Sequence, residues 1–103
     1  MVRFLVLYNT PIDIEAFERH YHEVHIPLGK KLSGLKRYTL SRNIAPIRGG
    51  DAYYMVAELD WDSTEALKQA FQSPEGQATA ADIENLEKLS PGIHSMIYEL
   101  EDF

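Results

Sequence analysis

The chain has 103 residues, 45% of them hydrophobic and 11% aromatic, which suits one compact domain with a core of its own. It contains no cysteine, so disulfides, thiolate metal sites and cysteine nucleophiles are excluded. Sixteen acidic against ten basic residues give a formal net charge of −6 at pH 7, which disfavours nucleic acid and anionic membranes as partners. The opening apolar run is too short for a signal peptide or a membrane span. We therefore expect a single cytoplasmic domain over residues 1–103, with neither nucleic acid nor membrane as a partner.

The first predicted elements are a strand and a helix. Residues 2–9 form a β-rich run that is apolar on both alternating faces, as in a central strand. From Asp13, the predicted N-cap, apolar residues recur at spacings of three and four, which indicates a helix packed on one side. The predicted apolar stripe consists of Ile14, Phe17, Tyr21, Val24 and Leu28. Because Pro27 lacks an amide donor, we expect this helix to kink or end near His25 before one final turn.

Two strands follow, over residues 35–44 and 52–60, and they are expected to pair as a hairpin with a long loop. Gly49 and Gly50 lie in that loop, where glycine permits a positive φ.

The second half of the chain predicts more helix and a last strand. Residues 62–65 resemble a capping box at the start of one helix. Ser73 and Pro74 suit the cap and first position of another, which runs to about Leu89. The residues of this helix expected to be available for burial are Ala78, Ala81, Ile83, Leu86 and Leu89. Residues 93–100 complete the set as a strand.

The order β-α-β-β-α-β is the pattern of a ferredoxin-like α+β fold, with a four-stranded antiparallel sheet and helices on one face. In the first strand Val2, Phe4, Val6 and Tyr8 alternate with Leu5 and Leu7, so helices that cover one face would leave the other substantially apolar. Because a large apolar patch is unusual on a monomer, we expect a homodimer in which two sheets pack face to face. The alternative is a monomer with an unusually apolar surface.

Three of the four histidines lie within residues 20–25. On a regular helix His25 and His20 border the apolar stripe, whereas His22 lies further toward solvent. His25 is therefore the best candidate for a general acid or base that faces a cavity between helix and sheet. The alternative is a packed histidine bonded to a backbone carbonyl. A metal shared by His22 and His25 lacks a third ligand, so we predict no metal site.

Tyrosines form a second group of candidates. Tyr8, Tyr38, Tyr53, Tyr54 and Tyr98 all fall on predicted strands, where each can present a hydroxyl to an apolar cavity or simply pack in the sheet. We select Tyr38 as the donor that polarises a carbonyl or a developing enolate.

The expected ligand is a hydrophobic, aromatic or lactone-like small molecule. The residues predicted to contact it are Tyr8, Tyr21, His22 and Tyr54. The sequence has neither a GxGxxG turn between strand and helix nor a GK[ST] motif, so nucleotide and flavin fingerprints are missing. We therefore predict chemistry without a cofactor.

Several stretches resemble the EthD family across nearly the whole chain. The main ones are Tyr21-His22-Glu23-Val24-His25-Ile26-Pro27-Leu28 and Ser73-Pro74-Glu75-Gly76-Gln77, followed by Ala80-Ala81-Asp82. Supporting matches are Leu7-Tyr8-Asn9, Gly34-Leu35 through Tyr38, and Tyr53-Tyr54 before Glu58. The resemblance implies a dimeric α+β barrel and an association with bacterial ether degradation alongside a cytochrome P450 system.

The wider superfamily includes muconolactone and methylmuconolactone isomerases, polyketide cyclases and cofactor-free monooxygenases. His25 and Tyr38 occupy positions similar to a histidine and a tyrosine of the methylmuconolactone isomerases, whose second histidine is not matched near Ala52 and Tyr53. The resemblance thus implies a small catabolic or tailoring enzyme, with His25 moving a proton and Tyr38 polarising a carbonyl. The alternatives are a non-catalytic binding or accessory protein of an ether-degrading oxygenase, and a purely structural dimer without a cavity.

Overall fold

A computed structural model describes all 103 residues of the chain. It contains one four-stranded sheet with the order β2-β3-β1-β4, in which every neighbouring pair is antiparallel. In chain order the elements are β1 (Val2–Tyr8), α1 (Ile14–His20), a π-helical turn η1 (Tyr21–His25), α2 (Ile26–Gly29), β2 (Arg37–Arg42), β3 (Met55–Trp61), α3 (Thr64–Gln72), α4 (Pro74–Leu89) and β4 (His94–Glu99). The predicted ferredoxin-like α+β fold is confirmed.

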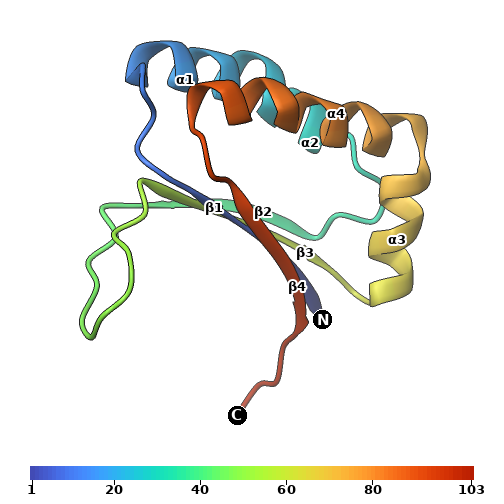
Figure 1. Ribbon diagram of the computed structural model, residues 1–103. Coiled ribbons are helices and arrows are strands. Elements are labelled where there is room, and N and C mark those ends of the chain that lie inside the picture. Colours follow the sequence, from blue (N-terminus) through green and yellow to red (C-terminus); the bar gives the residue numbers. More distant parts are fainter.

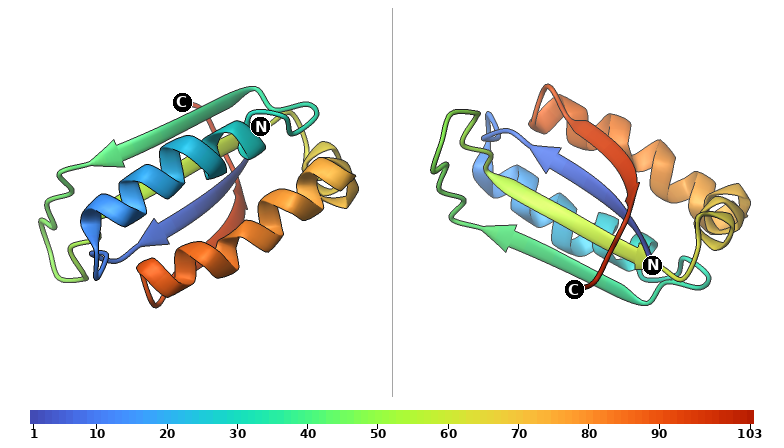
Figure 2. Two further views of the ribbon diagram at one scale, coloured as in Figure 1. Left: turned by 90° about the horizontal axis from the view of Figure 1, so that it is seen from above. Right: turned by 90° about the horizontal axis from the view of Figure 1, so that it is seen from below.

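The molecule has two layers, because the helices cover one face of the sheet and leave the other bare (Figure 1). Seen from above, the first helix and α4 run in opposite directions across the sheet (Figure 2). The core lies between the layers and includes Val2, Val6 and Tyr8 from one face of β1. This alternation follows from the pleat of a strand, which sends successive side chains to opposite faces.

The bare face of the sheet carries the other side chains of β1. Leu5 lies opposite Glu58 of β3 and Met96 of β4, and Leu7 lies opposite Val56 and His94. At one end of this face Arg3 pairs with Asp60, with Nε 2.8 Å from Oδ1. Nothing in the chain covers the apolar part, where Met96 is 47% exposed.

The first helix differs from the prediction in the residues that it buries. Phe17, Tyr21, His25 and Gly29 are buried at a constant spacing of four, whereas Val24 is 39% exposed. In a regular α-helix a spacing of four drifts by about 40° per step. The wider turn of η1, closed by a hydrogen bond from the Ile26 amide to the Tyr21 carbonyl, takes up this drift. The stripe predicted from α-helical spacing, which included Ile14 and Val24, is therefore wrong in part.

The same turn explains why Pro27 does not end the helix. Pro27 lies in the first turn of α2, where the hydrogen-bond ladder changes from the π to the α pattern and proline is tolerated. The predicted irregularity near His25 thus exists as a π turn within one continuous helix, and the predicted end is wrong.

Serine caps begin both later helices, of which the cap at Ser73 was predicted and the cap at Ser63 lies within the predicted capping box. Ser63 accepts a hydrogen bond from the Ala66 amide and Ser73 from the Gly76 amide. In α4 the buried positions are Gly76, Thr79, Asp82 and Leu86. Ala78 and Ala81, which we expected to be available for burial, are exposed, because their small apolar side chains lie on the solvent face of the helix.

The hairpin of β2 and β3 pairs as expected, and its loop contains Gly49 and Gly50 with φ of +59° and +80°. Its second strand begins at Met55, so Tyr53 and Tyr54 precede the sheet and do not lie in it. None of the helices is both long and apolar enough to cross a membrane.

Candidate functional site

A cavity of about 280 Å³ lies between the helices and the covered face of the sheet. For scale, a dry cavity of about 150 Å³ can hold benzene, so this one has room for a small ring compound. Its wall is mostly apolar. The lining residues are Phe4, Val6, Tyr8, Tyr21, His25, Gly29, Tyr38, Ala57, Leu59, Phe71, Thr79, Ala80, Ile83 and Ser95.

His25 is the titratable nitrogen group in this wall, and its side chain is only 7% exposed. Its Nδ1 lies 2.9 Å from Oδ2 of Asp82, a buried residue of α4. A carboxylate accepts hydrogen bonds, so Nδ1 carries the proton that is donated to Asp82. Nε2 forms no hydrogen bond within the chain and is left with a lone pair that can accept a proton from a bound molecule.

Burial and the carboxylate act on His25 in opposite directions. Burial lowers the pKa of His25, because a charged imidazole is poorly solvated there, and the nearby Asp82 carboxylate partly offsets this effect. The net result is a pKa below the usual value, so His25 is neutral at pH 7. A neutral imidazole is the form that acts as a base.

Asp82 stays ionised despite its burial. Burial alone would raise the pKa of Asp82, but hydrogen bonds from Asn85, His20 and His25 hold it below the usual value. Asn85 Nδ2 and His20 Nε2 reach Oδ1 at 2.9 and 2.8 Å. The carboxylate is therefore anchored at one oxygen and directed at His25 with the other.

Tyrosine hydroxyls supply the other polar groups of the cavity. The Tyr21 and Tyr38 oxygens lie 2.6 Å apart, while the buried Tyr8 hydroxyl forms no hydrogen bond. Burial raises the pKa of Tyr38 to about 12 and also raises that of Tyr8 and Tyr21. All three phenols are thus protonated at neutral pH. One of the two hydroxyl protons of Tyr21 and Tyr38 forms the hydrogen bond between them, so the other can be donated to a ligand oxygen.

Gly29 makes room for this pair. A Cβ at Gly29 would lie 2.8 Å from Cε2 of Tyr38, which is closer than two carbons can approach. The absence of a side chain in α2 therefore allows the Tyr38 ring to pack directly against the helix backbone.

Four of the six residues predicted to form the site line the cavity, namely Tyr8, Tyr21, His25 and Tyr38. His22 and Tyr54 lie outside this lining. Tyr98 lies opposite Arg3 on the bare face of the sheet, so it cannot reach the cavity either. Alternation along β4 sends Tyr98 to the opposite face from Ser95, which does line it.

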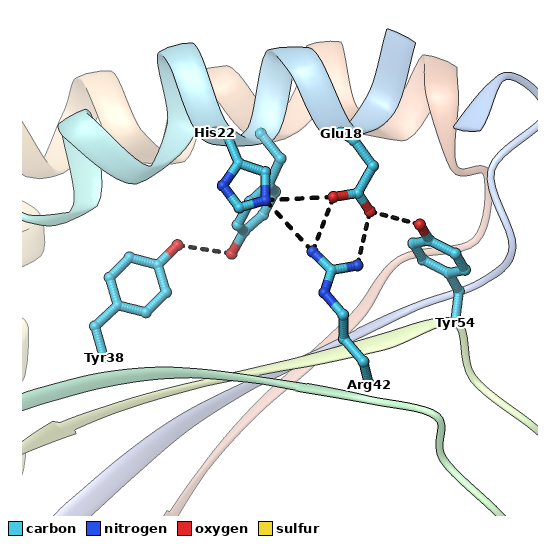
Figure 3. Close-up of polar contacts among 6 residues, drawn as sticks. Glu18, His22, Tyr38, Arg42 and Tyr54 are labelled. Carbon is cyan, nitrogen blue, oxygen red and sulfur yellow. Dashed lines mark hydrogen bonds and ion pairs between the residues drawn. The ribbon is translucent and has the colours of Figure 1, made fainter. Parts of the chain in front are cut away.

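His22 and Tyr54 belong instead to a Glu18 cluster, formed by Glu18, His22, Arg42 and Tyr54 (Figure 3). Glu18 accepts two hydrogen bonds from Arg42, at 2.7 and 2.9 Å, and one from the Tyr54 hydroxyl. His22 lies 3.3 Å from the same carboxylate. The cluster joins the first helix to β2 and to the segment before β3.

Asp82 and His20 were not predicted as site residues. Asp82 is 57 residues from His25 in the sequence, so their contact needed the fold. One signal was available, because Asp82 shares the helical face of Thr79 and Leu86 at spacings of three and four. An acidic residue on the buried face of a helix indicates a partner inside the protein.

No group of three or more His, Cys, Asp or Glu side chains is arranged to hold a metal ion. The polar groups of the cavity are instead one imidazole and several hydroxyls, a set that can move a proton and donate hydrogen bonds.

The fold and the cavity define a ferredoxin-like α+β protein with a small apolar site between its layers. Residues 9–89 match the EthD domain, and the chain belongs to the EthD family. An uncharacterized 11.0 kDa protein in the thcB-thcC intergenic region of Rhodococcus erythropolis is 36% identical over 85 residues, which are 82% of each chain.

Solved structures agree with this assignment. An EthD family protein from Bacillus halodurans is 32% identical, with a TM-score of 0.84 over 98% of this chain and 99% of that one. SnoaB from Streptomyces nogalater, a cofactor-independent oxygenase, is 20% identical, with a TM-score of 0.69 over 99% of this chain and 94% of its own. The likeness to SnoaB concerns the fold alone.

Proposed function

We propose that this protein is a cofactor-free enzyme that moves a proton on a hydrophobic ring or lactone-like molecule, as isomerases, cyclases and some monooxygenases do. The observation that carries the proposal is the buried contact between His25 Nδ1 and Asp82, which leaves Nε2 unpaired in the wall of an apolar cavity. Orientation of one imidazole nitrogen by a carboxylate makes the other nitrogen an effective base. SnoaB, which shares the fold, is a cofactor-independent oxygenase.

The proposed step is the removal of a proton from a carbon next to a carbonyl group. Nε2 of His25 takes the proton, the C–H electron pair forms the double bond of an enolate, and the carbonyl oxygen takes the negative charge. A proton from the Tyr21–Tyr38 pair stabilises that oxygen by a hydrogen bond. Where a C=C bond is conjugated with this enolate, return of the proton from Nε2 to the far carbon of that bond shifts the double bond and completes an isomerisation without an external reagent.

Deuterium exchange tests this step without knowledge of the product. Ring lactones, cyclic ketones and phenols are incubated with the protein in D₂O, and the loss of a carbon-bound proton is followed by NMR. We expect exchange with at least one class and a drop of at least about 100-fold in His25→Gln. His22→Gln, which changes a histidine of the same helix outside the cavity, should exchange like the wild type. Equal exchange in His25→Gln and the wild type would refute the role of His25.

A second candidate is a non-catalytic binding or accessory protein of an ether-degrading oxygenase system. The name of the Bacillus halodurans relative, an ethyl tert-butyl ether (EthD) family protein, favours this alternative. Such a protein would be stabilised by ethers or ring compounds in a thermal-shift screen, because a ligand that binds the folded state raises its melting temperature. Stabilisation without any exchange or product by mass spectrometry would select this function.

We also infer that two copies of the chain pack through the bare face of the sheet. Leu5, Leu7, Val56 and Met96 form an apolar area there that the chain itself does not cover. Burial of this area against an identical face would remove it from water. A homodimer of this kind leaves the cavity on the opposite side of each sheet.

A further inference from the structure

The carboxylate of Asp82 contacts two histidines at once. Its Oδ2 lies 2.9 Å from Nδ1 of His25, and its Oδ1 lies 2.8 Å from Nε2 of His20. His25 faces the cavity and is 7% exposed, whereas His20 is 24% exposed. The carboxylate thus lies between a histidine in the cavity and a histidine that reaches solvent.

The π turn is what allows both histidines to meet the same carboxylate. His20 and His25 are five residues apart, and in a regular α-helix such residues point about 140° away from each other. Residues 21–25 instead form the wider turn closed by the bond from the Ile26 amide to the Tyr21 carbonyl. This turn brings positions 20 and 25 to the side of the helix that packs against α4. Such turns occur frequently at functional sites.

We propose that His20 is a positioning residue of this site, which acts on His25 through the carboxylate of Asp82. The working unit is then His20, Asp82 and His25 together. The inference rests on the proposed function only in treating His25 as the base. It assigns a role to a histidine that does not line the cavity.

The geometry explains how His20 can act at this distance. Oδ1 of Asp82 is held by His20 and by Asn85 at 2.9 Å, so the carboxylate cannot turn away from His25 without losing two hydrogen bonds. A carboxylate also carries a single charge, so a positive charge on one histidine that it contacts leaves less of that charge to stabilise a proton on the other. The charge on one histidine therefore opposes charge on the other.

The other titratable groups near His25 are the phenols of Tyr8 on β1, Tyr38 on β2 and Tyr21 on its own helix. Burial raises the pKa of all three, so they remain neutral while His25 titrates. Asp82 from α4 raises the pKa of His25, and a charge on His20 lowers it. His20 and Asp82 are thus the charged groups to which the protonation of His25 responds.

An NMR titration of the His25 Cε1 proton tests the proposal on the ligand-free protein. In His20→Gln an amide replaces the imidazole ring, and we expect the pKa of His25 to rise by about 0.5 pH unit, which is about a threefold change in its protonation constant. His20→Asn provides a second variant if His20→Gln does not fold. The control His22→Gln removes an exposed histidine of the same helix and should leave the titration unchanged.

A double-mutant cycle with Asp82→Asn tests whether Asp82 is the link. In the Asp82→Asn background, His20→Gln should change the pKa of His25 by less than half as much as it does in the wild type. Equal changes in the two backgrounds would show that the two rings interact directly. No change of the His25 pKa in the wild-type background would show that the two histidines are not coupled. Either result overturns the proposal. Because the titration needs no ligand, it can fail or succeed independently of the deuterium exchange that tests the function.

Discussion

The hydroxyl oxygens of Tyr21 and Tyr38 lie 2.6 Å apart and join the first helix to the edge strand β2. Tyr21 is fully buried, so its hydroxyl has no water to replace this partner. The pair therefore lines the cavity and also stabilises the fold.

Removal of the Tyr38 hydroxyl should be costly. We expect Tyr38→Phe to lower the free energy of unfolding by about 1–2 kcal/mol, because it leaves a buried hydroxyl unpaired. Tyr54→Phe loses a hydrogen bond to the partly exposed Glu18 and should cost less. Urea unfolding of the two variants at the same protein concentration compares them. A smaller loss of unfolding free energy in Tyr38→Phe than in Tyr54→Phe would contradict a stabilising role for the hydrogen bond between Tyr21 and Tyr38.

Stability should fall as the pH drops through the histidine range. In the folded protein the pKa of His25 lies below its ordinary value of 6.5. Below pH 6.5 the unfolded chain therefore takes up a proton at His25 more readily than the folded chain does. The free energy of unfolding therefore decreases from pH 7 to pH 5. In His25→Gln the decrease should be smaller, since this contribution is lost. Denaturant unfolding at several pH values measures both slopes, and parallel curves would rule out a lowered pKa.

The bidentate contact between Glu18 and Arg42 should contribute modestly to the stability of the fold. Their side chains are 28% and 35% exposed, so solvent screens the ion pair. A double-mutant cycle of Glu18→Gln and Arg42→Met should give a coupling free energy of about 0.5–1 kcal/mol that decreases in 1 M salt. The NMR titration of His25 should not move in either variant. A change there would place the Glu18 cluster within the site.

The apolar face of the sheet can be tested through the mass of the protein in solution. Leu5→Lys introduces a charge at the proposed interface and should convert a dimer into monomers. Ile14→Lys makes the same kind of change on α1, where Ile14 is 49% exposed, and should leave the dimer intact. Sedimentation velocity over a range of concentrations distinguishes these outcomes. A wild-type protein that is monomeric at high concentration would disprove the interface.

Much of the fold could be predicted because its signals are local. The alternation along β1 and the serine caps at Ser63 and Ser73 depend on residues that are neighbours in sequence. The position of His25 in the cavity wall was also reached in this way, since it borders the apolar side of its helix on either helical geometry. Tyr38 was selected as a hydroxyl donor on a predicted strand, and it lines the cavity, but the sequence did not indicate which face of the sheet it occupies.

Other features depend on contacts between distant segments or on small changes of phase. The predicted stripe through Val24 assumed a uniform α-helix, and one π turn was enough to expose that residue. Whether Tyr98 faces the cavity or packs on the other side of the sheet could not be predicted, because a strand has two faces and the last strand gives no clear alternation. The buried face of α4 indicates that Asp82 has a partner inside the protein, but the identity of that partner depends on the packing of α4 on the first helix.

The π turn between Tyr21 and His25 also determines how the site tolerates change. The direction of the His25 ring is set by the hydrogen-bond ladder of the backbone, which no single side chain controls. Substitutions around this turn can therefore alter the chemistry of the site while the His25 ring keeps its direction. Regular α-helical winding over the same residues would set His20 and His25 about 140° apart and turn one of them away from Asp82.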